Sequence, residues 1–561
     1  MRISILSLSF LLCMNLYAFT VIDNYPIGNS LNAVPDQVIE VYFDDLIDVS
    51  TVNAQSVMAF GRWSGPADLS FEIAGFGNVL VITHAEPFIA GEYVMVSFSS
   101  SFSSMTGNTL EHGYTIGFWI RTLPGSMDLI DVGHLDVRNP GEGLIQSYGA
   151  YAGDLNNDGW GDLAVVNETA EDMRIFISDQ GSFGSFNTYV LPLGNKPSAN
   201  EGADFNGDGE IDMVIGNTQG NMMSIVLGNG DASFGEEVIY TAQQGVRGVT
   251  VIDLEGDGDM DVATANRQGN NVSLFFNDGA GNFSEAITLT TPLSAETAIL
   301  AADMNEDGIM DLVVGGYVSD DLVILLNDGT GNFTLSVQVS TGDAPWMIGM
   351  GDVNGDGHVD IASACSGSNE IGIHLGDGFG GLSAASLYST GSFPLAIDLG
   401  DLDGDGDLDV ISSNYAGGTY TLYENTGNGT LTDERTLLAE IAGSCAIFHD
   451  RNNDQVMDIT GIDELADVLI FFENQPTGIE EQEELGFSVY PNPAVDVLEV
   501  EFRLAEASLF ELFDMSGMKV DEFRMKADQS SAQWTLDKEL AKACYIVRRS
   551  GSITGLKITV E

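Results

Sequence analysis

The chain has 561 residues, of which 84 are Asp or Glu and 19 are Lys or Arg, so its formal net charge at pH 7 is −65. A polypeptide this acidic lacks the basic surface that nucleic-acid phosphates require, which excludes nucleic acid as a partner. The length allows several domains, and a hydrophobic content of 44% is enough to build their cores.

The first 18 residues are typical of a secretory signal peptide. Arg2 precedes an apolar run from Ile3 to Leu12, and Ala18 provides a small residue at the expected cleavage point. The run is too short to span a bilayer, and we find no later transmembrane candidate. Because Leu12, rather than a small residue, precedes Cys13, we do not expect a lipoprotein anchor. These features predict a protein that is secreted or held at the outer cell surface.

Residues 19–122 alternate apolar and polar positions between turns, most clearly at 38–43, 79–82 and 93–96. Alternation of this kind predicts a β-sandwich. The sequences YPIGNS, QVIEVYFDD, EPFIAGEYVMV and GFWIRT resemble bacterial Ig-like domains of the S-layer (SbsA) type. That resemblance implies a spacer or an adhesive module.

Seven acidic loops of nine residues recur between residues 154 and 458. Their first residues are Asp154, Asp204, Asp253, Asp303, Asp352, Asp401 and Asp450, which gives steps of 50, 49, 50, 49, 49 and 49 residues. A period this regular indicates one structural unit repeated seven times.

Each loop has the composition of a calcium site. Carboxylate or amide side chains stand at positions 1, 3, 5 and 9, and the backbone carbonyl of position 7 is a further oxygen. Calcium takes six to eight such oxygens. Glycine at position 6 permits a sharp turn with positive φ, and the seventh loop has Gln455 there instead. The predicted metal-binding residues are Asp154, Asn156, Asp158, Trp160 and Asp162; Asp204, Asn206, Asp208, Glu210 and Asp212; Asp253, Glu255, Asp257, Asp259 and Asp261; Asp303, Asn305, Asp307, Ile309 and Asp311; Asp352, Asn354, Asp356, His358 and Asp360; Asp401, Asp403, Asp405, Asp407 and Asp409; and Asp450, Asn452, Asp454, Val456 and Asp458.

Two other interpretations of the loops stay open. Asp, Asn and Gly are ordinary turn residues, so one such loop could be a solvated turn, although seven in register favour a metal. Magnesium is a weaker candidate because it retains water and rarely uses cages made of protein alone. We predict up to seven calcium ions.

Four short apolar segments accompany each loop, at 299–302, 312–314, 322–326 and 335–339 in the fourth repeat. Turns such as NDGTGNF separate them, and the region has no sustained helical period. Four strands repeated seven times predict an all-β fold, a seven-bladed β-propeller over residues 127–473. Since the seventh loop is followed by two strands only, we predict that residues 129–135 pair into the last blade and close the ring.

This region resembles FG-GAP or VCBS repeats, which also occur in integrin α-subunits. The resemblance implies that each metal loop joins the first two strands of a blade, opposite the usual ligand face, and that the ions stiffen the propeller. The chain departs from the integrin pattern by having a loop in every blade.

The opposite face would consist of the links that enter strand one and those between strands two and three. Aromatic residues there could stack on sugars or fill a partner's pocket, or they could cap the central channel. The candidates are Tyr148, Lys196, Arg247, Tyr317, Trp346, Phe393 and Tyr415.

The C-terminal part begins with a glutamate-rich linker at 474–485. Residues 486–561 start with a YPNP sequence and contain DMSGMKV, which resembles the C-terminal sorting domain of type IX secretion. The resemblance implies a small β-sandwich that is recognised by the type IX secretion machinery and removed at the surface. An ordinary terminal β-domain is the alternative.

The sequence has no recognisable catalytic constellation. Its six histidines are scattered, and none pairs with a nucleophile motif or a zinc-ligand spacing. We therefore expect a non-enzymatic protein that recognises an extracellular glycan or protein. A polysaccharide lyase or hydrolase on the same face, or a scaffold without a specific ligand, are the alternatives. Basic and tyrosine side chains converging with acids would favour the enzyme, and a flat aromatic face would favour binding.

Overall fold

The computed structural model describes residues 19–184, 189–192 and 196–477, together with seven strands between 487 and 560. The predicted signal peptide at 1–18 and most of the predicted linker lie outside these residues. Within them all regular structure is β except one short 3-10 turn, Val49–Thr51, which confirms the all-β prediction. None of the described elements is a helix with the length and hydrophobicity that a bilayer crossing takes. The chain forms two compact units, Met1–Pro476 and Thr477–Glu561.

The first unit begins with two four-stranded antiparallel sheets. Their orders are β1 (Val21–Tyr25), β2 (Ile39–Phe43), β6 (Val79–His84) and β5 (Leu69–Ala74); and β4 (Gly65–Pro66), β3 (Val57–Gly61), β7 (Tyr93–Phe98) and β8 (Tyr114–Trp119). In β2, Ile39, Val41 and Phe43 are buried while Glu40 and Tyr42 are partly exposed, as the period of two predicts. Both sheets share one apolar core, so they form a β-sandwich. Its Ig-like character stays a prediction.

Seven four-stranded antiparallel sheets follow within the described residues. In strand order they are β10 (Ser147–Gly153), β11 (Asp162–Asn167), β12 (Asp172–Phe176), β15 (Tyr189–Pro192); β16 (Pro197–Ala203), β17 (Asp212–Asn217), β18 (Met222–Val226), β19 (Val238–Thr241); β20 (Val246–Ile252), β21 (Asp261–Asn266), β22 (Asn271–Phe275), β23 (Ile287–Leu289); β24 (Glu296–Ala302), β25 (Asp311–Gly316), β26 (Asp321–Asn327), β27 (Phe333–Ser340); β28 (Pro345–Gly351), β29 (Asp360–Cys365), β30 (Glu370–His374), β31 (Ser386–Ser389); β32 (Pro394–Gly400), β33 (Asp409–Asn414), β34 (Thr419–Asn425), β35 (Leu431–Leu438); and β36 (Gly443–His449), β37 (Asp458–Asp463), β38 (Val468–Glu473), β9 (Ile130–Asp136). A short hairpin, β13 (Ser178–Asp179) and β14 (Ser182–Phe183), lies beside the first sheet in sequence.

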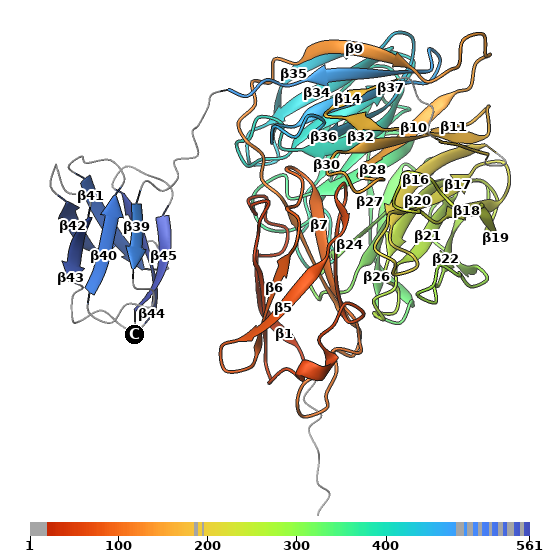
Figure 1. Cartoon of the computed structure of the whole chain (residues 1–561). Coiled ribbons are helices and arrows are strands. Elements are labelled where there is room, and N and C mark those ends of the chain that lie inside the picture. The colour runs from red at the N-terminus through yellow and green to blue at the C-terminus, as the bar shows by residue number, and fades with distance from the viewer. Residues whose placement is uncertain are drawn as a thin grey trace, which may run out of the picture. The chain divides into compact units, whose positions relative to one another are not determined.

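The sheets are arranged as the blades of a β-propeller. Their first strands contact one another in the cyclic order β10, β16, β20, β24, β28, β32, β36 and back to β10. The last sheet takes its outer strand from the start of the region, because β9 pairs antiparallel with β38, with Leu135 opposite Leu469. Figure 1 shows β9, in orange, among the blue strands of the last blades. The predicted closure of the ring is confirmed.

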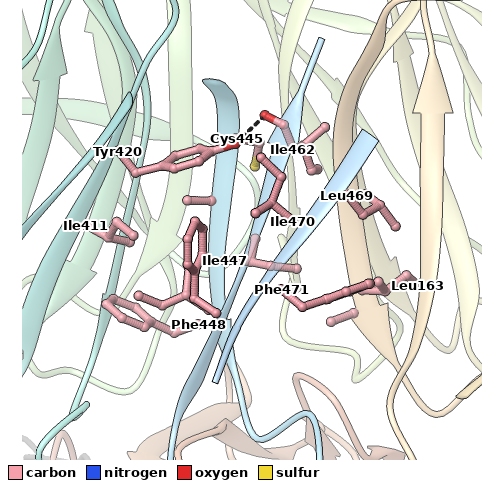
Figure 2. Close-up of a cluster of buried hydrophobic side chains, with 14 of the residues drawn as sticks. Leu163, Ile411, Tyr420, Cys445, Ile447, Phe448, Ile462, Leu469, Ile470 and Phe471 are labelled. Atoms are coloured by element: carbon pink, nitrogen blue, oxygen red, sulfur yellow. Dashed lines mark hydrogen bonds between the residues drawn. The ribbon is translucent and has the colours of Figure 1, made fainter. Parts of the chain in front are cut away.

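The apolar core around the last blade, β36 to β38 with β9, shows how neighbouring blades pack together. Figure 2 shows Phe448 and Ile470 among side chains that come from three blades. The hydroxyl of Tyr420, a fully buried residue, donates a hydrogen bond of 2.9 Å to the carbonyl of Ile462 in the next blade. Cys445 belongs to this core, and like Cys365 it is a buried free thiol.

The N-terminal sandwich lies against the acidic loops of the propeller. Its Ser100 amide donates to the carbonyl of Gly256 at 2.6 Å, and its Thr115 amide donates to the carbonyl of Gly308 at 2.7 Å. Backbone bonds also join Trp63 to Asp154, Leu123 to Gln455 and Gly125 to Asp403, and the Asn29 side chain donates to the Gly357 carbonyl. The sandwich and the segment that follows it, which includes Leu123 and Gly125, together contact six of the seven loops in this way. The sandwich is therefore docked on this face and does not act as a detached spacer.

The second unit contains only β-strands within its described residues. One sheet has the order β39 (Phe487–Tyr490), β40 (Val497–Phe502), β43 (Ser531–Thr535). The other has the order β42 (Lys519–Met525), β41 (Ser508–Asp514), β44 (Ala543–Arg549), β45 (Gly555–Val560). Both sheets are antiparallel, which agrees with the predicted terminal β-domain.

Candidate functional site

The acidic loops share one hydrogen-bond pattern that explains their residue types. In all seven, the amide of position 6 donates to the carboxylate of the first aspartate at 2.8–3.2 Å. The aspartate at position 9 is buried and ties the loop to the blade. Asp311, for example, accepts from the amides of Met304 at 3.1 Å and Asn327 at 2.9 Å. Each of these oxygens keeps a second lone pair, which is free for a cation.

The seventh loop keeps this geometry with two substitutions. Gln455 at position 6 adopts a φ of 69°, in the left-handed region where the other loops have glycine, and still donates to Asp450. Arg451 replaces an apolar residue at position 2 and is buried between Asp458, at 3.9 Å, and Glu473, at 2.8 Å. This loop therefore already has a positive charge beside its last aspartate.

The donor set of the sixth loop fits a hard cation. Carboxylate oxygens of Asp401, Asp403 and Asp405 lie within 4.8 Å of one another. Oδ1 of Asp401 and Oε2 of Glu255 are buried without a hydrogen-bond partner among the described residues. Burial, reinforced by the neighbouring carboxylates, raises the pKa of Asp401 to about 7 and that of Asp403 to about 6. A divalent ion would meet the need for positive charge that these groups create.

The side chains at position 7 point to neighbouring loops where the structure shows their partners. The Asn157 amide donates to Glu210 of the next loop at 2.7 Å, and Glu306 bonds to His358 of the following loop. At position 7 of these two loops the backbone carbonyl is thus the group left for a metal. The identity of the ligands stays a prediction.

On the opposite face, three residues from first strands form a compact group. Each stands six positions before a loop aspartate: Tyr148 on β10, Arg247 on β20 and Trp346 on β28. The Trp346 indole donates to the Tyr148 hydroxyl at 2.8 Å. The Arg247 guanidinium lies 4.6 Å from the Tyr148 ring centre and 4.9 Å from that of Trp346. These distances are typical of cation–π contacts.

The links between second and third strands extend this group, as does Phe393 in the link that enters β32. Arg267 lies 4.2 Å from the Tyr317 ring centre and 4.9 Å from that of Trp346. Phe393 lies 6.0 Å from Trp346, and Tyr415 lies 6.4 Å from Phe393. We call the set Tyr148, Lys196, Arg247, Arg267, Tyr317, Trp346, Phe393 and Tyr415 the mouth cluster. All its members are half-buried.

Two buried acids lie beneath the mouth cluster. Glu168 accepts from Arg247 at 2.9 Å and from Lys196 at 3.5 Å. Glu464 accepts a hydrogen bond from Gln146, and both acids are 6% exposed. Burial raises the pKa of Glu464 to about 7, and the nearby Glu168 raises it further. The acids hold the basic residues in place, since a buried carboxylate needs a paired cation.

The structure thus brings together all seven residues that the sequence analysis predicted for this face. Sequence reasoning missed Glu168, Arg267 and Glu464. Each stands fourteen residues after a loop aspartate, the position that Tyr317 and Tyr415 occupy in their own repeats. Alignment of the repeats by the loops would have found them.

A cavity of about 320 Å³ extends from the mouth cluster into the central channel. Its walls are the first strands of all seven blades, and residues of the N-terminal sandwich, including Trp63 and Trp119, close its other end. Arg62 projects into it and donates to Asp398 on β32 at 3.2 Å. Glu201 on β16 also lines it, and burial raises the pKa of that carboxyl to about 7.

Comparison with known protein families identifies two parts of the chain. A model of the FG-GAP-like repeat matches residues 154–215, 204–264, 253–314, 303–363, 352–412 and 401–460, which together span more than half of the sequence. A model of a secretion system C-terminal sorting domain matches residues 488–558. The second match indicates recognition by the type IX secretion system and delivery to the cell surface or the extracellular space.

Other comparisons concern individual proteins. No curated protein gives a significant match. Among solved structures, an Agrocybe aegerita lectin described as recognising non-reducing terminal N-acetylglucosamine is 15% identical, with a TM-score of 0.42 over 75% of this chain and 99% of the lectin. Virginiamycin B lyase from Staphylococcus aureus is 13% identical, with a TM-score of 0.41 over 61% and 98%. A periplasmic gluconolactonase from Pseudomonas aeruginosa is 12% identical, with a TM-score of 0.38 over 68% and 96%. These identities are too low to transfer a ligand or a reaction.

Proposed function

Because this chain belongs to the FG-GAP-like repeat family and ends in a secretion sorting sequence, we propose that it is an extracellular recognition protein whose propeller is stabilised by calcium. The binding surface in this proposal is the mouth cluster, and the ligand is an extracellular glycan or protein. The acidic loops hold the ions on the opposite face.

The observation that carries this proposal is the mouth cluster itself. Five aromatic rings and three basic side chains gather there, half-buried, around the opening of a cavity. Tyr, Trp and Arg dominate binding energies at interfaces because they bury a large area with few rotatable bonds.

The proposed calcium ions would serve structure rather than chemistry. Ions bound in the loops would neutralise carboxylates that are crowded beneath the N-terminal sandwich. They would thereby hold the blades and the sandwich together. The loops lie on the other face from the mouth cluster, so the ions would not touch the ligand.

A binding array tests this function. The secreted chain in calcium is applied to extracellular polysaccharides and glycoproteins, beside the variants Trp346→Ala and Phe379→Ala. Phe379 is 82% exposed on the fifth blade and lies in the turn between β30 and β31, away from the mouth cluster, so it is a matched control. We expect retention that Trp346→Ala abolishes and Phe379→Ala leaves intact. Retention unaffected by Trp346→Ala would refute the assignment of the surface.

A second candidate, an enzyme that cleaves polysaccharide, is favoured by two features. Arg247 and Lys196 converge with the acid Glu168 beside tyrosine rings, and further acids lie inside the cavity. Glu201 is a carboxyl group whose raised pKa would keep it partly protonated near neutral pH, and Asp398 is paired with Arg62. Glycoside hydrolysis uses two carboxyl groups, one of which donates a proton, and Glu201 suits that donor role. Mass analysis of the bound polysaccharides tests this: new oligosaccharides that disappear with Glu201→Gln would establish the enzyme, and their absence would exclude it for those substrates.

A further inference from the structure

The mouth cluster concentrates positive charge in a very acidic protein. Of the 19 Lys and Arg residues in the chain, Lys196, Arg247 and Arg267 converge there. Lys196 and Arg247 share Glu168 as their partner. Arg267 forms no ion pair within the described part of the chain, and its guanidinium stacks on Tyr317 and Trp346 instead. One cation at the opening therefore has no acidic partner.

Stacking leaves the edge of a guanidinium available. The ring faces hold the plane of Arg267, while its N–H groups stay in that plane, where a carboxylate can accept two of them. The Nε of Arg247 is likewise buried without a hydrogen-bond partner. Burial lowers the pKa of Arg267, so the charged form has lost hydration that a ligand anion would offset. Both arginines thus have unused capacity for an anion.

The cavity limits the size and the direction of the ligand. A volume of about 320 Å³ is at the lower end of small-molecule sites and can hold about one or two sugar rings. The walls near the opening carry small residues such as Gly149, Ser198 and Gly248. Because Trp63 and Trp119 of the N-terminal sandwich close the far end, a polymer cannot pass through the channel. A chain can only enter by its end, and its entry requires the hydrogen bond between Trp346 and Tyr148, which crosses the mouth cluster, to break.

The aromatic residues and the floor of the cavity suit a sugar more than a simple anion. Arg247 already lies over the ring faces of Trp346 and Tyr148, so a sugar ring would pack beside these stacked groups, where the half-buried indole of Trp346 still offers apolar contact area. Arg62, Asp398 and Glu201 offer donors and acceptors deeper inside, which match hydroxyl groups. An inorganic anion would use the arginines only.

We propose that the mouth cluster and the cavity bind the end of an acidic saccharide, with a uronate carboxylate on Arg267 and Arg247, the sugar ring against Trp346, and the terminal residue inside the cavity. This proposal rests on the proposed recognition function and specifies its ligand class. The N-terminal sandwich has a defined part in it, as the floor that restricts binding to chain ends.

Calorimetry with the full secreted chain in calcium tests the proposal. The probes are tetrasaccharides of galacturonate, of guluronate and of hyaluronan, each beside its carboxyl-reduced neutral form, and a galacturonate polymer of about fifty residues. We expect at least one acidic tetrasaccharide to bind, with its reduced form at least 30-fold weaker. The matching polymer should bind one protein per chain end, whatever its length.

Single substitutions distinguish a loss of ligand recognition from a loss of folding. Arg267→Gln should weaken binding of the acidic probe at least tenfold and lower the melting temperature only slightly, because Arg267 makes no ion pair among the described residues and folding loses only its stacking on Tyr317 and Trp346. Arg267→Lys should recover part of the affinity, and Phe379→Ala should have no effect. Equal binding of acidic and neutral forms would overturn the inference while leaving glycan recognition intact. Binding along the polymer in proportion to its length would overturn the end-on mode.

Three further outcomes are decisive. An acidic peptide of eight glutamates that displaces the saccharide with equal affinity would refute the saccharide class. Failure of all three acidic probes, together with retention of neutral glycans on the array through Trp346, would refute the acidic ligand alone. Failure of the probes and of the array together would refute the recognition function as well.

Discussion

Removing divalent cations should make the stability of this protein strongly dependent on pH. The buried aspartates at position 9 of the loops carry raised pKa values, about 7 for Asp162, Asp212 and Asp360 and about 8 for Asp311 and Asp409, chiefly because they are buried. In the unfolded chain an aspartate has a pKa of about 3.9. The folded state therefore holds protons that the unfolded state has released.

The direction in which stability changes with pH follows from this difference in pKa between the folded and unfolded states. Where the folded pKa is raised, the stabilising contribution is complete below about pH 4 and is lost as pH rises through 7 to 8. Each pKa unit corresponds to about 1.4 kcal/mol, so a shift of only one unit in each of five such groups costs about 7 kcal/mol at pH 8. That is comparable to the whole stability of a typical domain, about 5–15 kcal/mol.

The assay is calorimetric melting of the full chain between pH 5 and pH 8. Protein dialysed free of divalent cations should lose about 10 °C or more in melting temperature over this range, and protein in millimolar calcium should lose little. A metal-free melting temperature that is flat, or that rises with pH, would refute the reasoning. So would a melting temperature that calcium leaves unchanged at pH 8.

A loop variant and a matched control sharpen this test. Replacing Asp401, Asp403 and Asp405 with Asn removes the charges of one loop. We expect the variant to gain less from calcium and to be more stable than the parent when metal-free at pH 8. Asp231→Asn, in an exposed turn of the second blade that lies outside the loops, should change neither quantity.

Three further predictions concern folding. Deleting residues 127–136 removes β9 and exposes the edge of β38, so the melting temperature should fall sharply; an unchanged melting curve would contradict ring closure. Gln455→Gly relieves a left-handed φ of 69° and should stabilise the protein by about 1 kcal/mol, seen as a small rise in melting temperature; a fall would show that the glutamine side chain is needed. Glu92→Ala leaves the amides of Ile89, Trp63 and Ser64 without their buried acceptor, and limited proteolysis should then release the N-terminal sandwich; a resistant variant would argue that the loop contacts suffice.

The repeat architecture could be predicted because its causes are local. A period of about 49 residues, glycine at the turn of each loop and short apolar segments each report on a few neighbouring residues, so the strands, the loops and the closing strand at 129–135 were all visible in the sequence. Gln455 shows that the residue type at one position does not by itself determine the geometry of a loop. Its amide keeps the bond to Asp450 because the other bonds of the loop hold the backbone there.

The candidate site was predictable only in part. The position in the repeat indicated which face Tyr148, Trp346 and Phe393 occupy, because strand order assigns each link to one end of the blade. Glu168 and Glu464 could not be interpreted as partners of basic residues, since the pairing of Glu168 with Arg247 joins different blades. Distances between blades depend on how many blades share the ring, and no local pattern encodes them.

By itself, the sequence determined a secreted, all-β repeat protein with an acidic loop in each repeat, since hydrophobic period and turn chemistry act over a few residues. Only the tertiary structure decided that the N-terminal sandwich docks on those loops and closes the channel. The bond between Arg62 and Asp398 joins residues 336 positions apart in the chain. Contacts of that kind arise from the matching of two finished surfaces, which exist only after both domains have folded.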